Sequence, residues 1–438
     1  MNFADSRGYP RLLSLLFPGL LIGIFVPCIA SGEDFSLELT EFEKKPYTLG
    51  GFAEIKWERM NIREEGSTTL LNLHDPPSTL NRLTTSMQFK GSYTKWIAGF
   101  NWLAAGYARQ DDLGWADSLD LYEGYLTLHP RPAINGALGK KAYTWGKGYA
   151  WNPVGFINRT KDPNNPEEAL EGYATAEAEW IKSFSGALQN IAFTSVVLPV
   201  ERNLNEDFGA EGHVNLAAKL YLLYFDTDVD FIVYTGESRT DRFGFDFSRN
   251  ITTNFEMHGE IAYLTDIDRP ILQQDGGISV ETGDITSALV GIRHLSSQDL
   301  TSIVEYYYNG DGYSAKEMSI FHDLVDDAAA QRTNAGDDDL PVTISGSRSY
   351  TRPYAGENYL YARFSLKEPF DILYFTPAMT TIINLDDDSF SLTPELIYTG
   401  YTNWELRLRY AILEGDPGSD FGEKQNRSRL ELRLRYFF

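Results

Sequence analysis

The last eleven residues, Ser428-Arg-Leu-Glu-Leu-Arg-Leu-Arg-Tyr-Phe-Phe438, alternate between apolar and charged side chains. One parity carries Leu430, Leu432, Leu434, Tyr436 and Phe438, and the other carries Arg429, Glu431, Arg433 and Arg435. Because successive side chains of a β-strand point to opposite faces, this period of two predicts a strand with one apolar and one charged face. A soluble β-sandwich and a membrane β-barrel could both contain this strand, so the rest of the chain has to distinguish these two all-β folds.

The same alternation recurs along the chain, for example at 403–413, where Trp404, Leu406 and Leu408 alternate with charged residues. About 18 such segments of roughly 9–13 residues are present, a length that suits strands crossing a bilayer. The predicted strands are 48–60, 80–93, 96–109, 118–130, 133–145, 173–182, 188–199, 213–225, 227–235, 242–251, 254–264, 285–295, 299–308, 358–367, 374–385, 389–399, 403–413 and 428–438.

Short and long connections alternate between these segments. Short turns occur at 93–95, 130–132, 225–226, 296–298 and 400–402, and long polar loops are expected at 61–79, 146–172, 200–212, 265–284, 309–357 and 414–427. Keeping all long loops at one end is typical of a closed, antiparallel, up-and-down transmembrane β-barrel. Merging the strands around 386–388, or splitting 173–182 differently, would give 16 strands. Either number leaves an aqueous lumen.

The C-terminal strand resembles the final strand of bacterial outer-membrane porins. Those strands typically end in an aromatic residue, usually Phe, which the barrel-insertion machinery reads, and Tyr436 and Phe438 match this signature. The resemblance implies a β-barrel in the outer membrane of a Gram-negative cell, with short periplasmic turns and long extracellular loops. It also implies outer-membrane lipid and the barrel-assembly machinery as partners.

The N-terminal 32 residues have the pattern of a secretory signal peptide. Two arginines precede an apolar run at 12–30, and the small residues at 30–32 close it. A single transmembrane anchor is the alternative, because about 19 apolar residues could just span a bilayer, but Pro18 and Pro27 interrupt the run. The predicted organisation is therefore a signal peptide at 1–32, a periplasmic lead at 33–47 and a barrel at 48–438.

Composition excludes several classes of site. The single cysteine, Cys28, lies inside the predicted signal peptide, so the exported chain has no thiol for disulfides, zinc ligation, covalent haem or catalysis. Pro27 before Cys28 also argues against lipidation. A formal net charge of −24 disfavours nucleic acid as a partner. No cofactor is expected.

The charged faces of the last two predicted strands form a stripe on one wall of the lumen. The predicted pore-lining residues are Arg407, Arg409, Arg429, Arg433 and Arg435, with Glu405 and Glu431 among them. One interpretation is an anion-attracting stripe. The other is a seam of cross-strand ion pairs, completed by Glu54, Lys56 and Glu58 of the first strand.

The segment 139–148, Gly-Lys-Lys-Ala-Tyr-Thr-Trp-Gly-Lys-Gly, leaves a predicted strand through Trp145-Gly146. It continues through Lys147, Gly148 and Trp151 into a loop rich in Asn and Pro. The segment resembles a strand-to-loop signature of several porin-like outer-membrane families over about 30 residues, and the glycines would let the loop bend into the lumen as a constriction. The alternative places Trp145 in the aromatic belt at the membrane interface, ahead of a loop outside the barrel.

Three further patterns leave alternatives open. A helix is predicted at 316–331, with Met318, Phe321, Leu324 and Val325 on one face, either over the pore mouth or on the rim. The acid runs 337–339 and 386–388 are either solvated or calcium-binding, although neither has the spacing of a defined calcium loop. His258 between Glu256 and Glu260 indicates either lumenal polarity or a metal ligand. No metal site is predicted.

These observations predict a porin-like channel for passive transport of small polar or anionic solutes. No enzyme is predicted, because the Gly-x-Ser-x-Gly elbow of serine hydrolases is absent. Two alternatives from other classes remain. One is a structural barrel that holds envelope proteins, such as the sheath of a porin–cytochrome conduit, in which any haem would belong to the partner. The other is an outer-membrane enzyme or adhesin displayed on the long loops.

Overall fold

The structure is a computed structural model that describes residues 45–73, 76–166, 168–335 and 348–438. The predicted signal peptide and residues 33–44 of the predicted lead lie outside the described residues, as does the acid run at 337–339. Residues from Pro46 to Phe438 form one compact unit.

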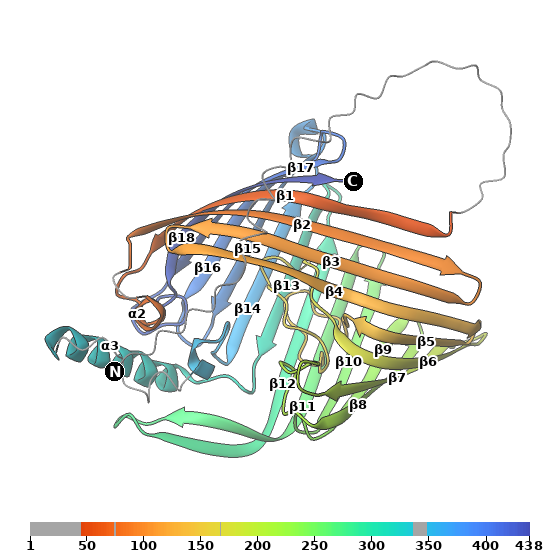
Figure 1. The fold of residues 1–438 in the computed structure, drawn as a ribbon, viewed down its shortest axis with the longest axis horizontal. Helices are drawn as coiled ribbons and strands as arrows, with labels where there is room; N and C mark the ends of the chain where they lie inside the picture. Colours follow the sequence, from red (N-terminus) through yellow and green to blue (C-terminus); the bar gives the residue numbers. More distant parts are fainter. Residues whose placement is uncertain (1–44, 74–75, 167, 336–347) are drawn as a thin grey trace. The chain divides into compact units, whose positions relative to one another are not determined.

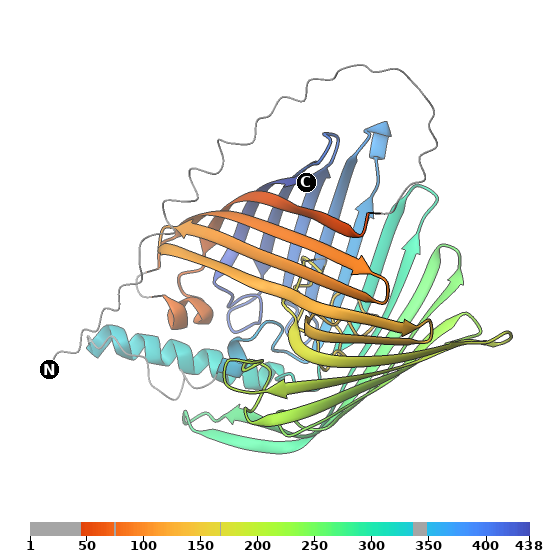
Figure 2. The same cartoon turned by 45° about the vertical axis from the view of Figure 1, so that its right-hand side comes forward.

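Eighteen antiparallel strands close into one barrel (Figures 1 and 2). Each strand pairs with its neighbours in the chain, and β18 pairs with β1 to close the sheet. The strands are β1 (Tyr47–Ile62), β2 (Thr79–Lys95), β3 (Ala98–Asp111), β4 (Gly114–Arg131), β5 (Ile134–Lys141), β6 (Tyr173–Ser183), β7 (Leu188–Val200), β8 (His213–Tyr224), β9 (Thr227–Thr235), β10 (Arg242–Thr252), β11 (Phe255–Leu272), β12 (Ile278–Leu295), β13 (Leu300–Tyr308), β14 (Asn358–Leu366), β15 (Phe375–Asn384), β16 (Phe390–Tyr398), β17 (Trp404–Glu414) and β18 (Asn426–Phe437). The predicted barrel and its 18 strands are confirmed, and the alternative of 16 is wrong.

The two faces of the sheet are inverted relative to a soluble protein. On β18, Leu432 and Leu434 are 44% and 40% exposed, whereas Glu431 and Arg433 are 2% and 5% exposed. Apolar side chains therefore point outward and charged ones point into the barrel. This is the arrangement that a bilayer requires, because hydrocarbon meets the outer face and the lumen holds the polar groups.

The end of the barrel that carries both termini of the sheet has short connections only. They comprise two to eight residues, at 96–97, 132–133, 184–187, 225–226, 253–254, 296–299, 367–374 and 399–403. Large aromatic side chains are exposed in these turns, among them Trp96, Phe225, Phe370 and Tyr401. Aromatic girdles of this kind sit at the membrane interface of outer-membrane barrels.

The opposite end carries the long connections at 63–78, 142–172, 201–212, 236–241, 309–357 and 415–425. The predicted long loop at 265–284 is wrong, because β11 and β12 stay paired as far as Leu272 and Ile278 and join through a five-residue turn. Gly276 in this turn has φ +82°, a backbone conformation that favours glycine. Beyond the membrane both faces of a hairpin meet water, so the apolar alternation that marks the other strands fades here.

Two α-helices of the described residues lie in the long connections. The six-residue α2 (Ser67–Asn72) follows β1, and α3 (Ala315–Ala335) follows β13; α3 confirms the helix predicted at 316–331. Met318, Phe321 and Val325 of α3 are buried in one apolar cluster with the tip of β11, and the leucines of α2 pack against the same cluster. The helix therefore connects loops that arise from well-separated strands. No helix in the described part of the chain is long and apolar enough to cross a membrane.

Candidate functional site

The connection between β5 and β6, residues 142–172, folds into the barrel; we call it the inner loop. Its backbone is held by two buried lumenal carboxylates. Glu260 of β11 accepts hydrogen bonds from the N–H groups of Lys147 (2.5 Å) and Gly148 (2.6 Å). Glu305 of β13 accepts those of Tyr149 (2.6 Å) and Ala150 (2.8 Å). Four consecutive backbone donors are thus bound to the inside of the wall.

The side chain of Lys147 strengthens this attachment. Its Nζ lies 2.8 Å from a carboxylate oxygen of Asp230 on β9 and 3.7 Å from one of Asp246 on β10. Burial alone would lower the pKa of Lys147, but these carboxylates outweigh burial and raise its pKa above the ordinary value. Lys147 is therefore charged at neutral pH and neutralised by the wall, so it is not a free cation of the lumen.

The glycines of the Trp-Gly-Lys-Gly segment are required by this close approach. Gly146 has φ +106°, and a Cβ there would lie 2.7 Å from Glu260 Oε1. A Cβ on Gly148 would lie 2.1 Å from the carbonyl oxygen of Trp151. Larger residues at either position would push the backbone away from the carboxylate that holds it.

Trp145 and the following Trp151 are both buried inside the barrel. Trp145 packs edge to face against Tyr143, and Trp151 stacks on Tyr307 of β13, with ring centroids 5.1 Å apart. Trp145 is 6% exposed, so the alternative that placed it in the membrane-interface belt is wrong. Two apolar clusters of the molecule accordingly lie between the inner loop and the wall.

The wall formed by β17, β18, β1, β2 and β3 carries a register-matched row of basic residues. Arg407 lies opposite Arg433, and Arg433 lies opposite Lys56. Lys56 in turn lies opposite Thr84, and Thr84 lies opposite Arg109. We call Arg407, Arg433, Lys56 and Arg109 the cation row. Like charges that face each other across strands repel, so the row needs carboxylates nearby.

Glutamates of these strands and of the adjacent β16 supply these counter-charges. The pairs and nitrogen–oxygen distances are Arg407 with Glu405 (3.1 Å) and Glu395 (3.6 Å), Arg409 with Glu395 (2.5 Å) and Glu431 (4.0 Å), Arg429 with Glu58 (3.6 Å), Arg433 with Glu431 (3.0 Å) and Glu54 (3.7 Å), and Arg435 with Glu54 (2.7 Å). All five predicted pore-lining arginines are therefore ion-paired, and the seam of the barrel is a charge network.

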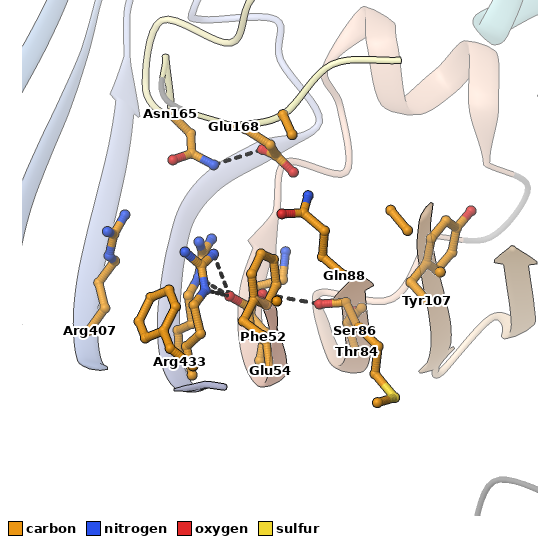
Figure 3. Close-up of a pocket in the computed structure, with 18 of the residues that line it drawn as sticks. Phe52, Glu54, Thr84, Ser86, Gln88, Tyr107, Asn165, Glu168, Arg407 and Arg433 are labelled. Carbon is orange, nitrogen blue, oxygen red and sulfur yellow. Dashed lines mark hydrogen bonds and ion pairs between the residues drawn. The ribbon is translucent and has the colours of Figure 1, made fainter. Parts of the chain in front are cut away.

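A cavity of about 760 Å³ separates this wall from the inner loop. Figure 3 shows Asn165 and Glu168 of the loop on one side, with Glu54, Arg407 and Arg433 on the other. Asn165 donates a hydrogen bond to Glu168 (2.7 Å), which keeps the two loop residues together. The basic lining residues are Lys56, Arg82, Lys90, Arg109, Arg407, Arg409, Arg429, Arg433 and Arg435, and the acidic ones are Glu54, Glu58, Asp162, Glu168 and Glu431.

Comparison with known proteins places the fold. No protein-family model matches the chain, and no curated protein matches its sequence. Among solved structures, the outer membrane protein OprD of Pseudomonas aeruginosa is similar with a TM-score of 0.52 at 10% identity, over 90% of this chain and 94% of that one. OccK11 of the same organism is similar with a TM-score of 0.51 at 12% identity, over 89% and 95%. The fold is that of a porin-like outer-membrane β-barrel.

Several residues of this porin-like barrel escaped the sequence analysis. Glu260 and Glu305, which hold the inner loop, lie more than 100 residues from their partners in the chain. Arg109 of β3 completes the cation row, but no pore-lining residue was predicted on this strand. The only signal for Glu260 was its place in the Glu256, His258, Glu260 alternation, which marked a polar lumenal face without saying what it binds.

The remaining chemical candidates have structural partners. His258 is buried and lies 2.8 Å from Glu305, so it helps to hold the carboxylate that anchors the inner loop. Asp386 accepts backbone hydrogen bonds from Glu357 and Asn358, and Asp387 accepts that of Ser389. Among the described residues no group of three or more acidic, histidine or cysteine side chains could hold a metal ion.

Proposed function

We propose that this barrel is a channel for passive passage of small solutes, with a modest preference for anions. The cation row is the observation that carries the proposal. Four basic side chains at one register level face the cavity that the inner loop narrows. A solute that crosses the barrel has to pass between this wall and the loop, where charges facing each other across a narrow space are screened less than charges on a wet rim.

The balance of charge sets the size of the preference. Nine basic and five acidic residues line the cavity, which is an excess of four positive charges. Asp111, Glu395 and Glu405 contact these cations from just outside the lining and reduce the excess. The inner loop contributes only acidic charges, Asp162 and Glu168. We therefore expect the anion selectivity to be modest. At low salt the charges of the acidic loops are screened less and act over longer distances, so the selectivity should shift toward cations.

Reversal potentials in planar bilayers under a salt gradient test the proposal. Replacing Arg407, Arg409, Arg433 and Arg435 by Gln should abolish anion preference without closing the pore. Because those changes also leave buried glutamates unpaired, the double variant Lys56→Gln/Arg109→Gln is the cleaner test. It removes half of the cation row and leaves the arginine–glutamate seam of β17 and β18 intact. Lys182→Gln is the matched control, since Lys182 does not line the cavity.

Two results would contradict the proposal. A purified, folded protein that shows no conductance would exclude a channel. Unchanged reversal potentials in the quadruple and the double variant would show that the wall is a structural seam of ion pairs, and that selectivity, if any, arises elsewhere.

The alternative of a protein-holding sheath receives less support from the geometry. The lumen already contains the inner loop, fixed by five backbone hydrogen bonds and the Lys147 ion pairs. The space beside it includes cavities of about 760 and 680 Å³, which is the size range of small-molecule sites. An inserted cytochrome would have to displace the loop.

An enzymatic alternative also receives little support. Ser67 of α2 lies within 3.0 Å of His322 on α3 and 3.1 Å of Glu423, a grouping with the residue types of a hydrolytic triad. Ser67 is fully buried, however, and its hydroxyl is enclosed between the two partners. The three residues link loops that arise from three different strand pairs, which indicates a structural role.

A further inference from the structure

A second cavity, of about 680 Å³, lies at the long-loop end of the barrel; we call it the vestibule cavity. It is bounded by the inner loop, by the ends of β10 to β13, and by the connections at 201–212 and 236–241. Apolar rings face it from Trp151, Phe156, Tyr173 and Tyr307. It does not share a lining residue with the cavity at the cation row.

Four cations line the vestibule cavity: Arg159, Lys161, Arg239 and Arg242. Its two carboxylates are already engaged, because Asp207 pairs with Arg159 and Asp311 pairs with Arg352. The other three cations have no carboxylate within ion-pair distance in the part of the chain that the structure describes.

Arg239 and Arg242 lie over the rings of Phe208 and Tyr234, and the hydrogen bonds of these cations go to backbone carbonyls, so none of these contacts supplies a counter-charge. Lys161 Nζ donates to the carbonyl of Gly148 (2.9 Å), and Arg239 donates to the carbonyls of Phe156 (3.2 Å) and Phe208. The buried Nε of Arg242 has no hydrogen-bond partner among the described residues. The carboxylates that act electrostatically on Lys161 are those of Glu260 and Glu305. Both already accept hydrogen bonds from the backbone of the inner loop.

Burial without a counter-charge is costly for a cation. Desolvation lowers the pKa of Lys161 and of Arg239, which shows that both are partly withdrawn from water. The cations also approach from different elements, Lys161 from the inner loop and Arg239 and Arg242 from the β9–β10 connection and the start of β10. An anion with one charged group would neutralise either Lys161 or the two arginines, whereas a dianion can contact both sides.

We propose that the vestibule cavity binds a small organic dianion, such as a dicarboxylate or a phosphate monoester, between Lys161 and the Arg239–Arg242 pair. The aromatic rings would pack against the carbon skeleton of the ligand, and the volume fits a small-molecule site. The proposal deepens the proposed channel, on which its role in solute uptake rests, but the binding step itself can be measured without transport.

The test uses the full-length protein in detergent micelles at constant ionic strength. Succinate and glycerol 3-phosphate are titrated as dianions, with butyrate as the monoanion, and binding is followed by calorimetry and by Trp fluorescence. We expect saturable binding of at least one dianion, at least about tenfold tighter than butyrate. Preference for succinate or for glycerol 3-phosphate would identify carboxylate or phosphate as the recognised group.

Variants assign the binding to the cavity. Lys161→Gln and Arg242→Gln should each weaken dianion binding by about tenfold or more, because each removes a charged hydrogen-bond donor. The charge-conserving Lys161→Arg should retain most of the affinity, and heat-modifiable gel mobility verifies that each barrel is folded. Lys182→Gln, which lines neither cavity, should leave dianion binding unchanged.

The outcomes distinguish this inference from the proposed channel. No saturable binding of either dianion, or equal affinity in Lys161→Gln, Arg242→Gln and the unsubstituted protein, would overturn the site even if the pore conducts and Lys56→Gln/Arg109→Gln alters its selectivity. Dianion binding that is lost in Lys161→Gln supports the site even if the barrel shows no conductance.

Discussion

Removal of the Glu260 carboxylate should release the inner loop from the wall. Glu260 accepts four hydrogen bonds from that loop: from the backbones of Lys147, Gly148 and Val154 and from the side chain of Asn152 (2.9 Å). In Glu260→Ala all four donors lose a buried, charged acceptor. The strand itself should be unaffected, since the side chain points into the lumen and takes no part in strand pairing.

The magnitude follows from the number of bonds lost. A hydrogen bond to a charged group contributes about 1.5–3 kcal/mol, and water that enters the lumen recovers part of this. Taking about 1–1.5 kcal/mol for each of the four bonds gives about 4–6 kcal/mol for detachment of the loop. Because 1.4 kcal/mol corresponds to a factor of ten, the open state of the loop should become on the order of a thousand-fold or more better populated.

Hydrogen–deuterium exchange of the folded protein measures this directly. Peptides that cover 145–154 should exchange on the order of a thousand-fold faster in Glu260→Ala, while peptides from β1 to β4 keep their protection. Bilayer recordings should show larger or noisier conductance as the loop leaves the lumen. Glu395→Ala is the matched control, because it also removes a buried lumenal carboxylate but one that binds arginines of the wall.

The reasoning fails if the 145–154 amides exchange equally slowly in Glu260→Ala and in the unsubstituted protein. Equal acceleration in Glu395→Ala would also refute it, because the effect would then report general loosening of the barrel rather than loss of the loop's own acceptor.

Three other predictions concern assembly, topology and pH. Deleting Phe438, which hydrogen-bonds through its backbone to Gly51 and packs on Phe89, should lower outer-membrane levels and leave periplasmic aggregate; unchanged levels with normal heat-modifiable mobility would refute a role as assembly signal. Epitope tags at about 340 or 420 should react with antibody on intact cells and tags at 131 or 401 only after permeabilisation, and the reverse pattern would invert the topology. Burial lowers the pKa of His322 below 6.5, despite the opposing carboxylates of Glu423, Asp420 and Asp387. An exposed histidine therefore binds protons more readily than the buried one, so docking of α3 on α2 should be stable above pH 6.5 and weaken as the pH falls below it. Proteolysis of the 309–357 connection should accordingly accelerate between pH 7 and 5. The same acceleration in a His322→Gln variant would show that another group titrates.

The sequence alone was sufficient for the barrel, for about 18 strands with 16 left open, and for the direction of its faces. Alternation such as Leu432, Arg433, Leu434 is a local property, since the pleat sends neighbouring side chains to opposite faces whatever the strand pairs with. The loop predicted at 265–284 is instead a paired hairpin, because strand residues that lie beyond the bilayer no longer need an apolar face. The helix α3, in contrast, was predicted from the sequence, because its buried residues recur at helical spacing.

The candidate site depended on contacts between distant parts of the chain. The arginines of the last two strands were visible as a charged face, but their partners were set by the register of β18 against β1, which joins the two ends of the sequence. The same closure placed Lys56 beside Arg433 and brought Arg109 into the row. No local pattern encodes a register between strands that lie hundreds of residues apart.

The course of the inner loop was likewise decided by tertiary structure. Gly146 and Gly148 showed from the sequence that the backbone could turn sharply there, but not toward what. Glu260 and Glu305 give the direction, because buried carboxylates need donors and the loop backbone supplies five of them. Sequence periodicity thus determined the wall of this barrel, whereas the satisfaction of buried charges inside the closed wall determined what fills it.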